Sequence, residues 1–425
     1  MFRSHRYCVC VLCFTLGVLL LLAMMLFSPS ATQAAPAKPV SFVNDVAPIL
    51  RESCFACHNG KKRSGKFDMT TYAGLRKGGD KADPIAPGKP DESLIIDLLT
   101  AKDSKRMPPA KEGGEALPKE KVAVIDQWIK EGAKLDDGVQ VTADLYRELR
   151  MRWKPPTPPS VYARPVTITA LAFTPDNQKL IVGGNHELTL WNIAEAKLEK
   201  RIYTRAERAY AIVVLPDGKV AVAGGRPGQE GDVKIYDING GTPKDEGGVQ
   251  VLDGVNDAGV LIGKLIEVDD CINCLAVTKD GKKLASGGCD RVVNVWDLSE
   301  GYAKPKLEQS FENHADWVFG VAFTADNKYL LTGSRDKTAK VWDLTAKESV
   351  LTFSDHQATV FGVAVSPDGK TGISVGDDKQ IRFWNTTGDP KQIAAAPGHG
   401  DAIFRILRHP TQPLLVTCRD RKSVV

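Results

Sequence analysis

The sequence lacks most features that mark a nucleic-acid-binding protein or a familiar hydrolase. Its 425 residues carry 56 Lys and Arg against 52 Asp and Glu, a formal net charge of +4. Because binding to a polyphosphate backbone needs a marked basic excess, we expect no nucleic-acid partner. No Ser-His-Asp set, phosphate-binding loop or closely spaced carboxylate pair stands out. Hydrolytic and phosphoryl-transfer activities therefore have no candidate residues, and we lean towards a protein that is not an enzyme.

The overall composition excludes several architectures. A hydrophobic fraction of 43% and a charged fraction of 25% are ordinary values for a globular protein. We therefore expect neither wholesale disorder nor a collagen-like repeat nor a polytopic membrane protein. The length predicts two or three domains.

An apolar segment near the N-terminus predicts export. Residues 7–27 contain only apolar or small side chains and follow Arg3 and Arg6, which is typical of a signal peptide. The segment is also long enough to span a bilayer. Residues 1–35 are thus expected to be a cleaved signal peptide or a retained inner-membrane anchor, and the rest of the chain to be exported, to the periplasm. Three cysteines of this segment are interpreted as apolar filler, namely Cys8, Cys10 and Cys13.

The strongest chemical signal is a Cys-x-x-Cys-His motif. One helical turn places Cys54 and Cys57 on one face, where both thiols can reach the vinyl groups of one haem, and His58 follows to ligate the iron. A zinc site would need four ligands, yet these three are the only Cys and His between residues 41 and 150. A redox dithiol would need a thioredoxin-like βαβ context that this region lacks. Covalent haem is the favoured interpretation, with zinc and dithiol sites as alternatives.

Methionine is the expected ligand on the other side of the iron, because no second histidine lies in this region. Met69 follows His58 too closely to reach the opposite haem face easily, so it is interpreted as a core residue. Two prolines follow Met107 and hold it on a stiff, extended loop. We therefore predict Met107 as the distal ligand. The alternative is that Met107 packs on the haem edge.

Helical periodicity surrounds the motif and predicts a small all-α domain built around a flat cofactor. Apolar residues recur at helical spacing before Cys54 and after Pro118. The first set is Val43, Val46, Ile49 and Leu50, and the second is Val122, Ile125, Trp128 and Ile129. A third segment, residues 94–99, follows Asp91, Glu92 and Ser93, which are placed to cap it.

Residues 42–134 resemble the planctomycete-type cytochrome c domain. The resemblance rests on the Cys54–His58 motif, on Pro87-Gly88-Lys89-Pro90 followed by Ser93-Leu94, on Met107-Pro108-Pro109 and on Trp128-Ile129-Lys130-Glu131-Gly132-Ala133. It implies one haem c bound covalently to Cys54 and Cys57, with His58 as the proximal ligand and Met107 as the distal ligand.

Four cations follow the motif, at Lys61, Lys62, Arg63 and Lys66. They could surround an exposed haem edge and steer an acidic redox partner towards it. The simpler interpretation, which we favour, is a solvated loop.

The chain then changes character. Residues 145–152 are predicted to form a short helix, and the proline-rich stretch 153–159 is expected to form a stiff polyproline spacer. Short alternating strands follow and predict an all-β region. The expected domains are a haem domain at 40–136, a linker at 137–164 and a β-propeller at 165–425.

The β region repeats, with an offset of 42 residues between Trp342 and Trp384. Further units centre on Trp191, Tyr236 and Trp296, and a sixth begins at Gly398-His399. These segments resemble WD40 repeats, with Val-Trp-Asp at residues 295–297 and 341–343. The resemblance implies a propeller of about six repeats. It also implies a hydrogen-bonded set in each blade, to which His314, Asp336, Ser334 and Trp342 correspond.

Some repeats depart from this pattern. Blade three has Val268 where the histidine is expected, and blade one has Asn185 at the turn. Counted from Asp420, the tryptophan of the sixth repeat would fall just beyond Val425. We expect either a truncated product or a ring closed by residues 160–164, and we prefer truncation because an open ring leaves unpaired strand edges.

Cys271 and Cys274 invite comparison with a second metal site. Residues three apart in a strand point to opposite faces and lie roughly 10 Å apart, too far for a disulfide. These two, with Cys289 and Cys418, are predicted to be free buried thiols.

Three functions are consistent with these features. The first, which we favour, is an exported single-electron carrier whose propeller docks a redox partner protein. The second is a haem enzyme or sensor with an open iron site, which applies if Met107 does not ligate. The third is an exported scaffold in which the haem is accessory.

Overall fold

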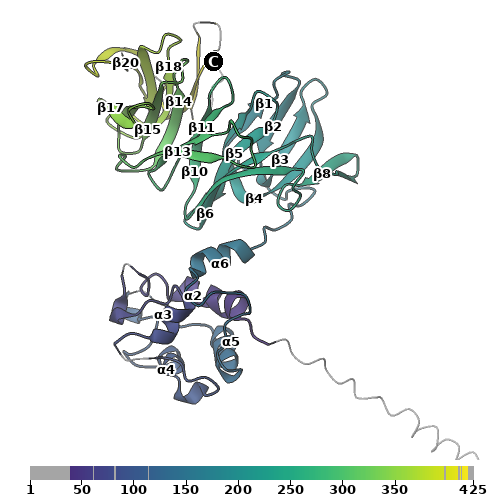
Figure 1. Cartoon of the computed structure of the whole chain (residues 1–425), viewed down its shortest axis with the longest axis vertical. Coiled ribbons are helices and arrows are strands. Elements are labelled where there is room, and N and C mark those ends of the chain that lie inside the picture. The colour runs from purple at the N-terminus through teal and green to yellow at the C-terminus, as the bar shows by residue number, and fades with distance from the viewer. Residues whose placement is uncertain are drawn as a thin grey trace, which may run out of the picture. The chain divides into compact units, whose positions relative to one another are not determined.

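The computed structural model describes residues 39–60, 62–80, 83–112, 114–396, 399–409, 412 and 414–419. The chain divides into two compact units, a helical unit up to Trp153 and a β-rich unit from Lys154 onward (Figure 1). The predicted export signal, Lys61, Gly398 and Asp420 lie outside the described residues. Within the described ranges, no helix is long and apolar enough to cross a membrane.

The helical unit is assembled from short helices. These are η1 (Phe42–Val46, a π-helix), α2 (Ala47–Ser53), η2 (Ser64–Lys66), α3 (Tyr72–Lys77), η3 (Pro90–Glu92), α4 (Leu94–Thr100), η4 (Ala110–Glu112), α5 (Lys119–Lys130) and α6 (Leu145–Arg152). The helical segments expected before Cys54, after Pro118 and at residues 94–99 are present as η1 with α2, α5 and α4. The sequence analysis missed α3, although Thr71 is a favourable N-cap and accepts a hydrogen bond from the Gly74 amide.

An aromatic cluster joins the ends of this unit. The Phe42 ring lies 5.1 Å from the Trp128 ring and 5.2 Å from the Tyr72 ring, so η1, α3 and α5 share one core.

The role of Ser93 differs from the predicted helix cap. The Ser93 hydroxyl donates to the Lys89 carbonyl and accepts from the Ala86 amide, so its side chain stabilises the preceding loop and does not cap α4.

The helix α6 belongs to the helical unit and not to the linker in which the sequence analysis placed it. Leu145 is fully buried in the helical core, and the Tyr146 ring lies 5.1 Å from the Phe55 ring, between the two motif cysteines. The Leu145 amide also donates to the Thr70 carbonyl. The boundary therefore lies after Trp153.

The β-rich unit consists of antiparallel sheets, as expected for a WD40 propeller. The first sheet contains β1 (Leu171–Phe173), β2 (Lys179–Gly183), β3 (Asn185–Asn192), β4 (Lys197–Val214), β5 (Val220–Arg226), β6 (Glu230–Tyr236), β7 (Lys244–Glu246), β8 (Val249–Asp253) and β9 (Leu261–Val268). The second contains β10 (Ile272–Val277), β11 (Lys283–Gly288), β12 (Val293–Asp297) and β13 (Lys306–Phe311). The third contains β14 (Val318–Phe323), β15 (Tyr329–Ser334), β16 (Ala339–Asp343) and β17 (Glu348–Phe353). The fourth contains β18 (Val360–Val365), β19 (Thr371–Gly376), β20 (Ile381–Asn385) and β21 (Gln392–Ala396), and β22 (Ile403–Arg408) pairs with β23 (Leu415–Arg419).

The long strand β4 explains why the first sheet is so large. Its first half pairs with β3 and its second half with β5, so one continuous strand ends blade one and begins blade two. We call the sheets β10–β13, β14–β17 and β18–β21 blades three, four and five.

A single arginine connects strands of three different sheets. Arg405 in β22 donates hydrogen bonds to the carbonyl oxygens of Tyr210 (3.1 Å), Asn273 (3.3 Å) and Phe319 (3.0 Å). These residues lie in β4, β10 and β14. Its side chain thus joins β22 to three strands that are distant in sequence.

Residues 160–164, the alternative segment expected to close the ring, contact blade one. Residues 160–164, all of them described, form no strand. The Tyr162 hydroxyl donates to the buried Glu187 carboxylate at 2.6 Å, and Arg201 donates to that carboxylate and to the Pro159 carbonyl. This segment is therefore fastened to blade one.

The repeated polar set is present in blades four and five, with one correction. In blade four the hydroxyl that joins His314 to Trp342 belongs to Thr332, at 2.7 Å and 2.9 Å, and not to Ser334. The reason is register. Trp342 pairs with Leu330, so Thr332 is its diagonal neighbour on the same face, whereas Ser334 lies roughly 13 Å along the strand.

Blade five repeats the arrangement. The Trp384 indole donates to the Ser374 hydroxyl, which lies 2.7 Å from His356 Nε2, and His356 Nδ1 lies 2.8 Å from the Asp378 carboxylate. Burial opposes ionisation of Asp378, but the hydrogen bond and charge of His356 outweigh it and lower the pKa of Asp378 to about 2.

Blade three lacks the histidine, as the sequence predicted, and its polar set is incomplete. With Val268 in that place, the buried Ser286 hydroxyl and Trp296 indole nitrogen have no hydrogen-bond partner among the described residues. Asp290 occupies the position of Asp336 and Asp378. Burial raises the pKa of Asp290, because no histidine compensates for the lost solvation.

The cysteines of the β-rich unit are free thiols with different exposures. Cys271 and Cys274 are buried as expected, whereas Cys289 is half-buried and Cys418 is exposed. The prediction that all four are buried is therefore wrong for Cys289 and Cys418. Cys418 lies in β23, which pairs only with β22 among the described strands, and Cys289 immediately follows β11.

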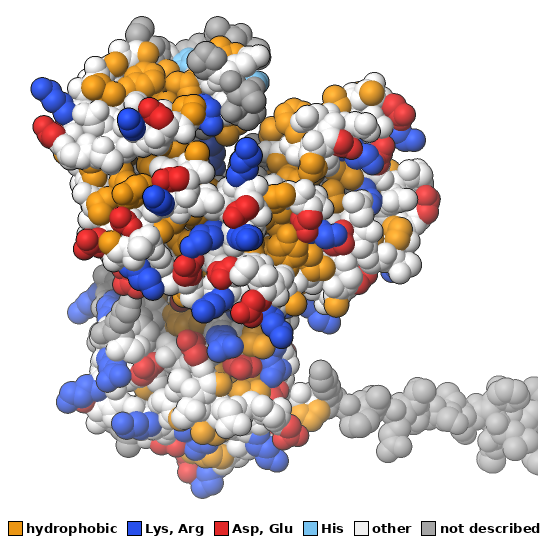
Figure 2. All heavy atoms as spheres, turned by 45° about the horizontal axis from the view of Figure 1, so that its top comes forward, with side chains coloured by type: hydrophobic (Ala, Val, Ile, Leu, Met, Phe, Trp, Pro, Cys, Tyr) orange, Lys and Arg blue, Asp and Glu red, His pale blue; other side chains and the backbone are white. Residues whose placement is uncertain are grey.

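The surface carries both charge signs. Figure 2 shows Lys and Arg interspersed with Asp and Glu on the visible face, with apolar patches between them. This face has no field of a single sign.

The α6 packing gives a first prediction. Replacing Phe55 with alanine should lower the free energy of unfolding of the helical unit by about 3–5 kcal/mol, because a fully buried ring that contacts α6 is lost. Urea unfolding followed by helical circular dichroism measures the change. Phe55→Leu, which retains most of the volume, should cost less than about 1.5 kcal/mol. Equal losses in the two variants would show that the ring does not fill the core.

The Asp378 set gives a second prediction. Because its folded pKa lies below the usual 3.8, Asp378 stabilises the fold above that value, and this stability is lost as the pH falls from about 5 to about 2. Asp378→Asn should remove about 2 kcal/mol at pH 7 and flatten the acid limb of a plot of urea midpoint against pH.

Asp290→Asn is the matched control. A raised folded pKa means that the carboxylate contributes stability at low pH that is lost as the pH rises, so this change should be neutral or stabilising at pH 7. A destabilisation of equal size in both variants would contradict the assignment.

Candidate cofactor site

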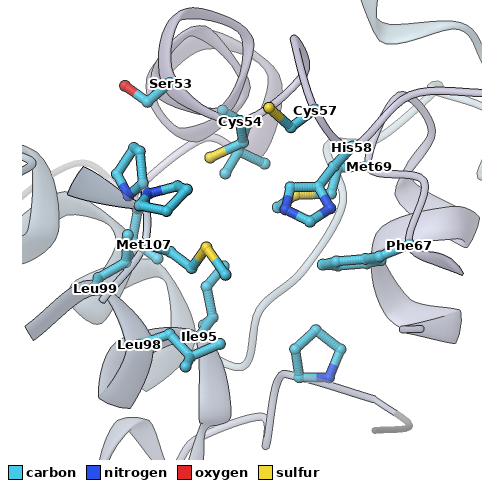
Figure 3. Close-up of a pocket in the computed structure, with 15 residues that line it drawn as sticks. Ser53, Cys54, Cys57, His58, Phe67, Met69, Ile95, Leu98, Leu99 and Met107 are labelled. Carbon is cyan, nitrogen blue, oxygen red and sulfur yellow. The ribbon is translucent and has the colours of Figure 1, made fainter. Parts of the chain in front are cut away.

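The helical unit contains an apolar pocket beside the Cys-x-x-Cys-His turn. Its empty volume is about 730 Å³, part of it open to solvent, a size typical of cofactor sites. The lining residues are Leu50, Ser53, Cys54, Cys57, His58, Phe67, Met69, Pro84, Ile95, Leu98, Leu99, Met107, Pro108, Pro109 and Ile125. All four residues predicted to bind a haem thus lie around one cavity (Figure 3).

The end of α2 positions the two thiols. The Cys57 and His58 amides donate to the Cys54 carbonyl at 3.1 Å and 3.0 Å, so the motif forms a single helical turn directly after Ser53. This is the geometry that the spacing predicted. Burial, with a smaller contribution from Cys57, raises the pKa of the Cys54 thiol to about 12. The Lys62 ammonium group lies 3.3 Å from the Cys57 sulfur.

The His58 imidazole points into the pocket (Figure 3). Its Nδ1 atom is buried and has no hydrogen-bond partner in the part of the chain that the structure describes. The Phe67 ring lies 5.4 Å from the imidazole. An imidazole held against apolar side chains, with a buried nitrogen unsatisfied by protein, fits a histidine that completes its bonding with a ligand in the pocket.

Met107 approaches from a different element. Its loop is anchored on α4, because the Met107 amide donates to the Leu98 carbonyl at 2.9 Å. Arg106 donates to the Gly114 carbonyl and closes the loop on its other side, and the Met107-Pro108 peptide bond is cis. The Met107 side chain is 36% exposed and reaches towards the pocket interior (Figure 3).

Met69 also lines the pocket, but beside the histidine. Its side chain is buried, and its amide donates to the His58 carbonyl at 2.9 Å. Both observations agree with the interpretation of Met69 as a core residue on the His58 side of the cavity. The choice of Met107 over Met69 as ligand remains a prediction.

The alternative of a zinc site gains no support. Among the residues described, no group of three or more His, Cys, Asp and Glu side chains is clustered to hold a metal ion. The donors at this pocket are instead two thiols, an imidazole and thioethers in an apolar lining, a set that suits a haem.

The cations after the motif are solvent-facing. Lys62, Arg63 and Lys66 are exposed, and Lys66 forms an exposed ion pair with Asp80 at 3.1 Å. An exposed pair of this kind contributes little to stability. The arrangement suits a solvated loop, and it leaves Lys62, beside Cys57, as the cation nearest the motif.

Sequence reasoning missed several lining residues. Phe67 and Pro84 come from loops without periodicity, and no local pattern marks them. Leu98 was detectable, because Leu94, Ile95, Leu98 and Leu99 follow helical spacing and so indicate one apolar face of α4.

Comparisons with known proteins agree with this site. The sequence model of the family described as Planctomycete cytochrome C matches residues 54–111, a span that begins at the first motif cysteine and includes Met107. The model described as WD domain, G-beta repeat matches residues 259–297, 305–343 and 347–385.

One curated protein is similar to part of this chain. Protein groucho of Drosophila melanogaster is 26% identical over 137 residues, which is 32% of this chain and 16% of that protein. The chain therefore corresponds to a small part of that relative's length. Taken together, the matches show that the chain joins a planctomycete cytochrome c segment to a series of WD repeats.

Proposed function

We propose that the helical unit binds one haem c covalently through Cys54 and Cys57, and that the protein carries single electrons. His58 and Met107 are the proposed axial ligands. The observation that carries the proposal is the convergence of both thiols, the imidazole and the Met107 thioether on one apolar pocket.

The pocket suits electron transfer better than oxygen chemistry. When bound, a haem supplies one-electron oxidation and reduction at its iron. The apolar lining excludes water and favours the less charged, reduced state, and a thioether ligand acts in the same direction. The Leu98 and Gly114 contacts hold the Met107 loop in place, so that its sulfur has a defined position.

We propose further that the protein is exported. The argument rests on residues 7–27, whose apolar character after Arg3 and Arg6 is that of a signal peptide or an anchor. Haem attachment to a Cys-x-x-Cys-His motif is compatible with this location. Either fate of the segment delivers both units across the membrane.

For the WD repeats we propose a protein-docking role. In blades four and five the His and Asp side chains of the polar sets form hydrogen bonds within the blade, which is a structural role. A redox partner protein is the proposed occupant, and a scaffold with an accessory haem is the competing function.

The first experiment tests haem attachment. The full chain, produced in a host that matures c-type cytochromes, should retain haem through denaturing electrophoresis and show the visible spectrum of a low-spin c-type haem. The Cys54→Ser, Cys57→Ser double variant should lose the covalent haem, because no thioether can form. Colourless wild-type protein would refute the proposal. N-terminal sequencing of the same preparation tests the cleavage of residues 1–35.

The second experiment tests the distal ligand. Met107→Ala should lower the reduction potential by on the order of 0.1 V, within the roughly 0.8 V range that axial ligation spans, and should let carbon monoxide bind the reduced protein promptly. Met69→Leu, the matched control, should do neither. Prompt carbon monoxide binding by the wild type would favour the open-site enzyme or sensor, and a ligand-loss spectrum in Met69→Leu would reassign the sulfur.

A further inference from the structure

Blade three carries two cysteines at the same end of neighbouring strands. Cys271 immediately precedes β10 and Cys289 immediately follows β11. The register pairs Ile272 with Gly288, which makes the two cysteines the next opposed pair. The Cys289 amide donates to the Cys271 carbonyl at 2.8 Å, so the backbones are held together at this position.

Blade four shows how side chains at these two positions are oriented. The corresponding residues are Trp317 and Arg335, whose backbones form the same hydrogen bond at 2.8 Å. The Arg335 guanidinium lies 4.8 Å from the centre of the Trp317 ring. Side chains at this pair of positions therefore face each other, as opposed residues on one face of a sheet do.

We propose that Cys271 and Cys289 are a redox-active dithiol that closes to an intramolecular cross-strand disulfide. Opposed residues at hydrogen-bonded positions have Cα atoms about 5.5 Å apart, within the range of about 4.4–6.8 Å that disulfides span. Their Cβ atoms need to approach by about 1 Å, and the pair lies beyond the last ladder residues, where such a movement is least restricted.

The reaction is thiol–disulfide exchange with an external disulfide, either a small molecule or a protein. Cys289 is half-buried and Cys271 is buried, so the Cys289 thiolate attacks first and releases one thiol of the oxidant. The Cys271 thiolate then attacks the sulfur of Cys289 in the mixed disulfide and releases the second thiol. The pair loses two electrons and two protons, and the oxidant's disulfide becomes two thiols.

The surroundings control the rate of this exchange. Burial raises the pKa of Cys271 to about 12 and also raises the pKa of Cys289. Thiolate is therefore scarce at neutral pH, which slows both adventitious oxidation and exchange with an external disulfide.

The pair is connected to strands of three sheets, namely β4, β10 and β14. Tyr210 of β4 forms a hydrogen bond to Cys271, and the Asn273 amide donates to Cys289 Sγ at 3.4 Å and to the Val318 carbonyl at 3.2 Å. Arg405 binds the carbonyl oxygens of Tyr210 and Asn273. Closure of the disulfide changes the hydrogen-bond partners of the Tyr210 and Asn273 side chains. The redox state of the pair therefore affects two residues whose carbonyl oxygens bind Arg405.

Cys274 provides the matched control. It is buried in the same strand, but its sulfur lies 3.4 Å from the Gly287 carbonyl and engages the backbone of β11. Cys274→Ser removes a buried thiol of the same blade and leaves the proposed pair intact.

The experiment uses the full chain, treated with oxidised glutathione or with dithiothreitol and then alkylated under denaturing conditions. Peptide mapping of the oxidised wild type and of Cys274→Ser should give a Cys271–Cys289 cross-linked peptide that is two hydrogens lighter than the reduced pair. Cys289→Ser should give none. The urea midpoint of the β-rich unit should rise on oxidation, except in Cys289→Ser, because a cross-link restricts the unfolded chain.

Three results would overturn the proposal. These are cysteines that both remain alkylatable after prolonged oxidation, stable glutathione adducts without a cross-link, or a cross-link to Cys274 in place of this pair. The decisive measurement is made on the wild type, so a variant that fails to fold does not affect it. It is also independent of haem loading, since peptides containing Cys54 and Cys57 are mapped separately.

Discussion

A buried polar atom needs a partner, and this constraint accounts for the main features of both units. In water-excluded surroundings an unsatisfied donor or acceptor costs about 1–3 kcal/mol. Blades four and five meet the requirement internally, through their His–hydroxyl–Trp sets. The helical unit leaves a buried nitrogen of His58 unsatisfied by the described protein atoms, inside a pocket lined by apolar side chains and sulfur.

The two units are therefore stabilised differently. Blades four and five each form the polar set from their own residues, so the same hydrogen bonds recur where the same residues recur. The helical unit has short helices and long loops around an apolar cavity, and its core depends on what fills that cavity. The packing of α6 against Phe55 stabilises the motif turn.

Blade three shows what happens when one member of the set is missing. Without a histidine at Val268, the Ser286 hydroxyl and Trp296 indole lose their partners, and Asp290 has a raised pKa where Asp378 has a lowered one. The same blade carries the opposed cysteines next to the Arg405 hydrogen bonds. Blade three thus lacks the complete polar set and also carries the proposed dithiol.

The sequence by itself determined the features set by local spacing. The Cys54–His58 turn, the helices α2, α4 and α5, the change to β structure and the repeated His and Trp positions all follow from residues a few places apart, because a helical turn or a strand fixes where such side chains point. Tertiary structure alone decided which hydroxyl joins His314 to Trp342, that α6 packs in the helical core, that Arg405 joins three strands and that Cys271 opposes Cys289. These depend on strand register and on contacts between distant residues, which no local pattern encodes.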